Sequence, residues 1–212
     1  MSSGKLFING TLDSDEMIIV SFNSFANNSY MEGIPPFGFV NTIQRTFPQY
    51  DRIFFADRSN TWWHSGITDE TYSIQETIEY LRNIISGYKK VFFMGSSCGG
   101  YGALLFGSIL NITGILAFCP QTEITKYAHI DNFYVDVDPF INQKTKYLIY
   151  GDPEIECGDW HQDVLCKRIC QFRKNVKYIP VNGSAYMTGF KNKEDLDLIF
   201  KNFFEDPDKY IS

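Results

Sequence analysis

Six short apolar runs, separated by turn residues and by segments of helical period, constrain the fold of this chain more than any other feature. Within each run apolar and polar side chains hardly alternate, which is typical of strands buried on both faces. The runs cover residues 17–22, 52–56, 90–95, 114–118, 146–150 and 176–181. Strands that alternate with helices along the chain favour right-handed crossovers and a mostly parallel sheet. The sequence therefore predicts an α/β protein with helices on both faces of the sheet.

Four segments between and after these runs are predicted to be helices. In the first and last of them apolar residues recur at spacings of three and four, and the second is rich in small residues. They are residues 71–86, 99–110, 161–172 and 194–204. Residues 121–144 form the longest stretch without a clear period. We expect an excursion over the top of the sheet at 121–145, and such excursions often act as lids. The length of 212 residues fits one domain over 1–212.

Charge and cysteine content narrow the function class. The net charge is −6 and the charged residues are scattered, so no footprint for nucleic acid or an anionic membrane is visible. No apolar run is long enough to span a bilayer. Five cysteines, an odd number, indicate free thiols and a reducing compartment. We therefore predict a cytoplasmic protein whose partner is a small molecule, and leave its oligomeric state open.

The most informative local pattern is Gly95-Ser96-Ser97-Cys98-Gly99, directly after the run at 90–95. In a parallel sheet, ligand chemistry takes place at the carboxyl ends of the strands. A G-x-S-x-G pattern between a buried strand and a small-residue helix is typical of a nucleophile elbow, a sharp turn whose glycines leave room for close backbone approach. Ser97 is the predicted nucleophile. A tight turn or a phosphate loop is the alternative, but no Gly-Lys-Ser/Thr follows as a Walker loop requires.

An elbow of this kind also predicts where an oxyanion would be held. The N–H of Cys98 would be one donor, at the start of a helix whose dipole favours negative charge. The second donor would come from the loop after residues 17–22, from Asn23 or Ser24, and we take Asn23. The Cys98 side chain is not the expected nucleophile, because the elbow exposes the preceding residue.

With these residues the chain resembles α/β-hydrolase-fold proteins, over nearly its whole length in element order and most specifically at 95–99. The residues at 99–107 and 117–121, together with Asp57, Trp62, Trp63 and Gly66, resemble bacterial hydrolase-like proteins more narrowly. Some of those relatives are associated with surface glycans. The resemblance implies a three-layer fold and a catalytic triad in the chain order Ser, acid, His.

The resemblance favours Asp159 as the acid of the triad, because it lies shortly after the run at 146–150 and just before the next helix. Asp152 is the alternative, and a helix N-cap is the structural interpretation of Asp159. The spacing of Cys157, His161, Cys166 and Cys170 matches no familiar zinc site. We predict neither a metal nor a cofactor.

The histidine of the triad departs from the family's pattern. In the family it follows the last strand, where this chain has Ala185 and Tyr186 and no histidine. A histidine elsewhere could serve as the base, His161 in the acid loop first and His129 in the excursion second. Alternatively, the chain is a degenerate hydrolase that binds a ligand without catalysis, or a variant from which the base has been removed.

Aromatic residues make up 17% of the chain, more than a core of this size requires. We interpret Trp62, Trp63 and Tyr186 as a substrate-binding wall near Ser97. A packed surface loop is the alternative for the two tryptophans. Two hypotheses remain: a serine hydrolase or acyltransferase that acts on a small acyl ester or acylated sugar through a Ser97 acyl-enzyme, and a binding protein that has kept only the fold.

Overall fold

A computed structural model describes residues 4–11, 15–25, 37–125, 131–153, 163–181 and 193–211. Its centre is a seven-stranded sheet in the order β1-β3-β2-β4-β5-β6-β7. Strand β1 pairs antiparallel with β3, and every other pairing is parallel. The strands are β1 (Lys5–Ile8), β2 (Met17–Phe22), β3 (Asp51–Phe55), β4 (Lys90–Ser96), β5 (Gly114–Phe118), β6 (Lys146–Gly151) and β7 (Val176–Pro180). The six predicted strands are thus confirmed, and β1 is an additional edge strand.

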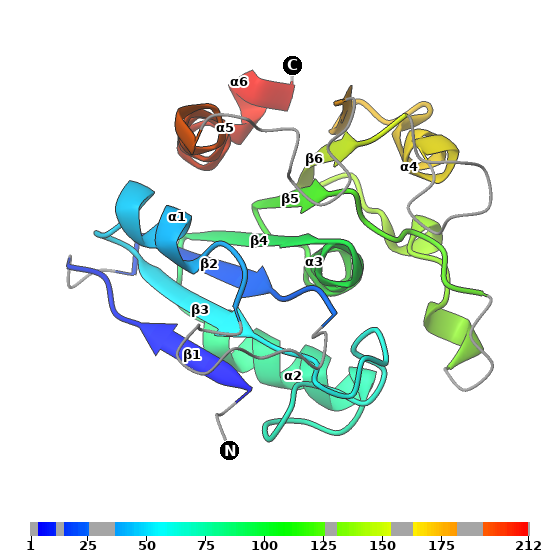
Figure 1. Cartoon of the computed structure of the whole chain (residues 1–212), viewed down its shortest axis with the longest axis horizontal. Coiled ribbons are helices and arrows are strands. Elements are labelled where there is room, and N and C mark those ends of the chain that lie inside the picture. The colour runs from blue at the N-terminus through cyan, green and yellow to red at the C-terminus, as the bar shows by residue number, and fades with distance from the viewer. Residues whose placement is uncertain are drawn as a thin grey trace.

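Helices cover both faces of this sheet, as Figure 1 shows. They are α1 (Val40–Thr46), α2 (Ile74–Ile85), α3 (Cys98–Leu110), α4 (Asp163–Cys170), α5 (Lys193–Glu205) and α6 (Pro207–Ile211). Two 3₁₀ turns, η1 (Asn132–Tyr134) and η2 (Asp138–Phe140), lie between β5 and β6. The four predicted helices correspond to α2, α3, α4 and α5, whereas α1 and α6 were not predicted.

The core has two halves, one on each face of the sheet. Along β2, Ile18, Val20 and Phe22 join the cluster that packs against α2, α3 and α4. Met17 and Ile19 point to the opposite face and join the cluster with α1, α5 and α6. Both faces are therefore apolar, which explains why the strands lack polar alternation. The predicted three-layer α/β architecture is confirmed.

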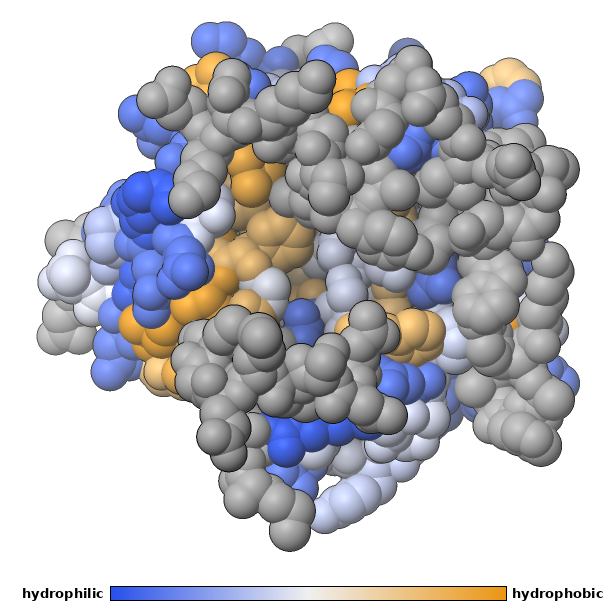
Figure 2. Space-filling model, viewed as in Figure 1, coloured by the Kyte–Doolittle hydropathy of each residue, from blue (hydrophilic) through white to orange (hydrophobic). Residues whose placement is uncertain are grey.

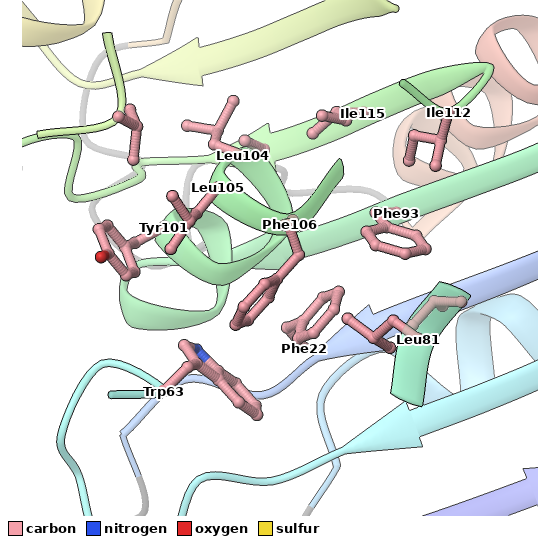
Figure 3. Packing of buried hydrophobic residues seen from close by; sticks show 14 of the residues in the cluster. Phe22, Trp63, Leu81, Phe93, Tyr101, Leu104, Leu105, Phe106, Ile112 and Ile115 are labelled. Carbon is pink, nitrogen blue, oxygen red and sulfur yellow. The ribbon is translucent and has the colours of Figure 1, made fainter. Parts of the chain in front are cut away.

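Helix α3 lies deepest in the molecule and positions the candidate site. All its residues from Cys98 to Ser108 are buried. Tyr101, Leu104, Leu105 and Phe106 pack among the side chains of the neighbouring strands and the loop after β3 (Figure 3).

No helix among the described residues is long and apolar enough to cross a membrane. Figure 2 shows apolar side chains in a hollow near the middle of one face of the molecule.

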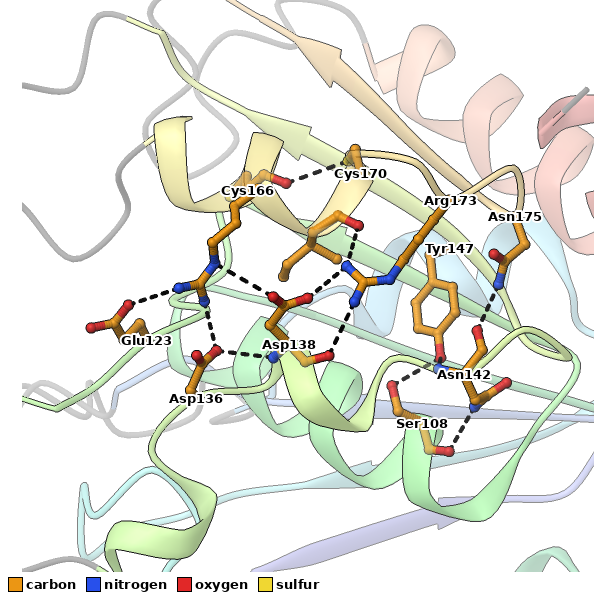
Figure 4. A network of polar contacts seen from close by, with 12 residues as sticks. Ser108, Glu123, Asp136, Asp138, Asn142, Tyr147, Cys166, Cys170, Arg173 and Asn175 are labelled. Atoms are coloured by element: carbon orange, nitrogen blue, oxygen red, sulfur yellow. Dashed lines mark hydrogen bonds and ion pairs between the residues drawn. The ribbon is translucent and has the colours of Figure 1, made fainter.

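The described parts of the 121–145 excursion are docked onto the domain rather than loosely attached. The guanidinium of Arg168 on α4 contacts Asp136 at 2.7 Å, Glu123 at 3.3 Å and Asp138 at 3.7 Å. Arg173 pairs with Asp138 at 2.6 Å (Figure 4). Arg168 on α4 and Arg173 shortly after it therefore hold the start and the middle of the excursion. The lid interpretation stays a prediction, and residues 126–130 lie outside the described part.

Candidate active site

Ser97 lies in a sharp turn between the carboxyl end of β4 and the first residue of α3. Its backbone has φ 53° and ψ −122°, a conformation that non-glycine residues rarely adopt and that costs of the order of 1–3 kcal/mol. Its side chain is at the amino terminus of a 13-residue helix, where the helix dipole favours negative charge. This is the strand, turn and helix arrangement that the sequence predicted around Ser97.

The two glycines of the pattern are required by close backbone contacts. A Cβ on Gly95 would lie 2.3 Å from the carbonyl oxygen of Gly99. A Cβ on Gly99 would lie 2.1 Å from the carbonyl oxygen of Phe22, at the end of β2. Neither backbone oxygen can rotate away as a side chain would. The first turn of α3 therefore packs directly against the ends of both β4 and β2.

Hydrogen bonds hold the backbone of Ser97 in this conformation. Its N–H donates to the carbonyl of Phe118 at 3.0 Å, at the end of β5. Its own carbonyl accepts from the N–H groups of Tyr101 at 3.0 Å and Gln121 at 3.4 Å. The turn is therefore tied to β5 and to α3, which offsets the cost of its backbone strain.

Two backbone N–H groups beside Ser97 have no acceptor among the described residues: those of Cys98 and Ser24. Cys98 begins α3, so its N–H has no carbonyl of the helix to bind. The Ser24 hydroxyl donates to the carbonyl of Ser96 at 2.8 Å and lies 2.6 Å from its hydroxyl, which places Ser24 next to the turn. Both amides are donors of the kind that stabilise an oxyanion.

The prediction that Asn23 supplies the second oxyanion donor is wrong. Its N–H donates to the carbonyl of Phe55 at 2.9 Å and so extends the pairing of β2 with β3 by one residue. The Asn23 side chain is also engaged, because its Oδ1 accepts from the N–H of Gly38 at 3.1 Å. Ser24, the alternative, is the residue whose amide is left without an acceptor.

The Cys98 thiol is not prepared for nucleophilic chemistry. The residue is only 1% exposed. Burial, and next the charge of Asp57, raise the pKa of this thiol well above its usual value. The neutral thiol is a weak nucleophile. This supports the view that Ser97, rather than Cys98, carries the chemistry of the turn.

The loop after β3 is strained and is organised by one carboxylate. Asn60, Trp62 and Trp63 have φ of 53°, 52° and 66°. The Oδ2 of Asp57 accepts from the N–H groups of Thr61 at 2.8 Å and Trp63 at 2.9 Å. Burial raises the pKa of the Asp57 carboxyl, and the bonds from the loop act against that rise. The Asp57 carboxylate thus stabilises a loop conformation whose positive φ values are rare for residues other than glycine.

Trp63 does not form a binding wall, because its side chain is completely buried. The indole packs edge-on against Phe22, 5.1 Å between ring centroids, and its Nε1 donates to the carbonyl of Cys98 at 3.1 Å (Figure 3). A Cβ on Gly102 would lie 2.7 Å from that nitrogen, so the glycine makes room for the ring. Trp63 therefore packs against the first turn of α3 and is not exposed to a ligand.

Trp62 is 4% exposed and joins two loops that flank the turn. Its Nε1 donates to the Oε1 of Gln121 at 2.6 Å. Its ring meets Phe25 edge-on, with 4.4 Å between centroids. The indole therefore offers little surface to a ligand. Its partner Gln121 lies 59 residues further along the chain, so no local sequence pattern indicates this hydrogen bond.

His64 is held as a neutral imidazole in a chain of hydrogen bonds. Its Nδ1 accepts from the N–H of Asp131 at 3.2 Å, and its Nε2 lies 3.0 Å from the hydroxyl of Tyr101. That hydroxyl donates to the carbonyl of Tyr134 at 2.6 Å, so Nε2 must be the donor to it. Burial lowers the pKa of His64 to about 4, against the opposing charge of Asp131. His64 thus links the excursion to α3.

Solved structures with the same fold share little sequence with this chain. The capsule O-acetyltransferase of Neisseria meningitidis serogroup A superposes with a TM-score of 0.66 at 16% identity, over 93% of this chain and 90% of that one. Est1E from Butyrivibrio proteoclasticus gives 0.57 at 10%, over 93% of each chain. A serine hydrolase homologue from Coxiella burnetii gives 0.59 at 11%, over 93% and 90%. This chain has the α/β-hydrolase fold. No family model and no curated protein sequence matches it.

In the α/β-hydrolase fold the acid follows a late strand, and here Asp152 directly follows β6. Its side chain is 2% exposed at the carboxyl end of that strand. Asp159, His161 and Tyr186, which the sequence assigned to the acid, the base and the binding wall, lie outside the described residues, as does His129. Their roles stay predictions.

The described residues contain no group of three or more His, Cys, Asp or Glu side chains placed to hold a metal ion. Cys166 and Cys170 are the two members of the sequence's Cys and His pattern that the structure describes, and they are not joined in a disulfide bond. Cys166 is buried on α4 and its thiol points to the carbonyl of Pro120 at 3.8 Å. Within the described part, these cysteines act as packing residues.

Proposed function

We propose that this protein is a serine hydrolase or acyltransferase that takes an acyl group from a small ester or an acylated sugar onto Ser97. The observation that carries the proposal is the strained turn at Ser97, with the amides of Cys98 and Ser24 beside it. A serine at the amino terminus of a buried helix, next to two N–H groups that find no acceptor in the described part of the chain, suits the formation of a tetrahedral oxyanion.

In the proposed reaction, the Ser97 hydroxyl oxygen attacks the ester carbonyl carbon and its proton passes to a base. The N–H groups of Cys98 and Ser24 stabilise the oxyanion, which collapses as the alcohol departs with that proton. Water then attacks the acyl-enzyme in a hydrolase, and a second alcohol attacks it in an acyltransferase. His161 is the proposed base, oriented by Asp159 or by the buried carboxylate of Asp152.

The structural neighbours agree with acyl chemistry on oxygen, since one is named an O-acetyltransferase and another a serine hydrolase homologue. Their identity to this chain, 16% and 11%, makes the likeness one of fold. The choice of an acylated sugar as substrate, and a cytoplasmic location, belong to the proposal. No nucleic-acid or membrane partner is proposed.

A second candidate is a binding protein that has lost catalysis. It is favoured by one feature of the sequence, the absence of a histidine from residues 182–189, where Ala185 and Tyr186 stand. A serine without a base attacks esters slowly at neutral pH. In this case the turn at Ser97 would be retained for ligand binding or for the packing of α3.

The two candidates are separated by active-site labelling. We expect a fluorophosphonate probe to label the wild-type chain and phenyl acetate to be cleaved with a burst, and the Ser97→Ala variant to show neither. Ser108→Ala is the matched control, because Ser108 is a buried serine on the same helix. No labelling of the wild type would overturn the enzyme proposal. Renewed hydrolysis in Ala185→His or Tyr186→His would then identify a lost base.

The acid can be identified with the same ester. Asp152→Asn and Asp159→Asn remove one carboxylate each with little change in shape. The variant that lacks the acid should lose activity by about 10²–10⁴-fold, as expected for removal of a group that orients the base. Equal and small losses in both variants would exclude a triad that uses either residue.

A further inference from the structure

Gln121 is a buried side chain at the turn that the proposed mechanism leaves unused. It follows the end of β5 by three residues, and its N–H donates to the carbonyl of Ser97 at 3.4 Å. In the sheet β5 borders β4 on one side and β2 borders it on the other. Gln121 therefore approaches Ser97 from the side opposite to Ser24.

The orientation of the Gln121 amide is fixed by chemistry. An indole nitrogen can only donate a hydrogen bond, so the atom 2.6 Å from Trp62 Nε1 must be the oxygen. The Nε2 group, with its two N–H donors, then points in the other direction. Trp62 thus selects one of the two flip states of this amide.

The Nε2 group has no hydrogen-bond partner among the described residues, although Gln121 is only 1% exposed. Nε2 is not among the fully buried polar atoms that lack a partner, so the small exposed part of this side chain leaves its N–H donors within reach of a ligand. The residue that orients it, Trp62, has a left-handed backbone with φ 52°, in a loop held by Asp57. A strained residue therefore fixes the orientation of an amide whose own backbone contacts Ser97.

We propose that Gln121 is a specificity-determining residue whose Nε2 group donates to an oxygen of the alcohol part of the ester. The proposal rests on the proposed function and names its substrate class more closely. Because the Ser24 amide is taken to hold the acyl oxygen on one side of Ser97, the opposite side is left for the alcohol. The preferred substrate is thus an ester of a polyol or sugar, whose hydroxyl and ether oxygens accept hydrogen bonds.

Two acetate esters test this assignment, because they share the acyl group and differ in the alcohol. Phenyl acetate has no acceptor in its alcohol part, whereas 6-O-acetylglucose has several. Gln121→Glu keeps an oxygen for Trp62 and the side-chain shape, but replaces the N–H donors by an acceptor. We expect kcat/KM for 6-O-acetylglucose to fall about 10- to 100-fold and that for phenyl acetate to stay within about 3-fold.

Three further variants serve as additional tests and controls for the role of Gln121. Trp62→Phe releases the amide from its fixed orientation, and should lower kcat/KM for the sugar ester about 3- to 10-fold and leave phenyl acetate unchanged. Gln121→Met removes the donors without adding a charge, and replaces Gln121→Glu if the latter fails to fold. Gln75→Glu makes the same exchange on α2, where Gln75 bonds the Tyr134 hydroxyl at 3.3 Å, and should leave both esters unaffected.

The outcomes separate the two proposals. If the wild type cleaves phenyl acetate through Ser97 but the Gln121 variants lose both esters equally, or neither, Gln121 has no role in specificity and only this inference fails. If the wild type shows no Ser97-dependent cleavage of either ester, the proposed function fails, and the role of Gln121 fails with it.

Discussion

Gly99→Ala is the substitution that most directly tests how the turn at Ser97 is built. The added Cβ would lie 2.1 Å from the Phe22 carbonyl oxygen and 2.8 Å from that of Asn23. The first contact is about 1 Å inside ordinary van der Waals distance. Both neighbours are backbone atoms, so α3 must move away from the end of β2, and with it the Cys98 amide moves away from that of Ser24.

The expected cost has two parts. Forcing extra volume into a packed core costs about 1–3 kcal/mol, and the small gain in helix propensity at the first turn of a helix does not offset it. A displacement of about 1 Å at reacting groups lowers rates by about 10²-fold. Gly99→Ala should therefore lower the free energy of unfolding by about 2 kcal/mol and slow fluorophosphonate labelling of Ser97 by about 10²-fold.

Gly107→Ala is the matched control on the same helix. Its Cβ would lie 2.6 Å from Cδ1 and 2.9 Å from Cγ1 of Ile115, which are side-chain atoms and shift at lower cost than the backbone atoms that a Cβ on Gly99 meets. Replacing glycine within a helix gains about 1 kcal/mol, so the net change in stability should be close to zero. Urea unfolding and the labelling rate measure both effects. If the two variants behave alike, close packing of α3 on β2 does not position the site.

Two further predictions concern the contacts that dock the excursion. His64→Gln keeps a donor and an acceptor but cannot titrate. Because the pKa of His64 is lowered to about 4 in the folded state, its contribution is complete above about pH 6.5 and is lost as the pH falls towards 4. Between pH 7.5 and 4.5 the free energy of unfolding of the wild type, measured in urea, should fall by about 1–2 kcal/mol more than that of His64→Gln. This value allows for solvent screening at the half-buried site. Equal decreases in the two proteins would contradict the hydrogen-bond chain. Arg168→Met removes the arginine that pairs with Glu123 and Asp136 and leaves Asp138 paired with Arg173 alone, and should destabilise the fold by about 1–2 kcal/mol at low salt and less in 1 M NaCl. A salt-independent loss would show that packing, not charge, is responsible.

Six of the seven strands could be predicted because they are apolar runs with little polar alternation, and the elements that were missed carry weak local signals. Strand β1 has four residues at the sheet edge, of which Phe7 is 45% exposed. Helix α1 is preceded by Phe39 as its N-cap residue, and the φ of 64° and the lack of a side-chain cap there give no recognisable start signal. Tertiary packing, rather than local propensity, decides these elements.

The site was predictable where the sequence pattern is local and not where it depends on pairing between distant strands. Gly95 and Gly99 identify the turn because close backbone contacts require them. Whether Asn23 or Ser24 offers a free amide depends on where pairing with β3 stops, one residue beyond β2. The burial of Trp63 depends on the space that Gly102 leaves, on a helix far along the chain.

The position of backbone strain bears on the choice between an active site and a retained fold. Packing of α3 accounts for both glycines of the turn and for the Trp63 indole against Cys98. It does not account for the left-handed backbone of Trp62, whose indole bonds a side chain instead of the fold's backbone. Strain of this kind persists where a function depends on the conformation. It therefore adds support to the proposed role of Gln121 toward a ligand, and reactivity at Ser97 is the property that would distinguish catalysis from binding alone.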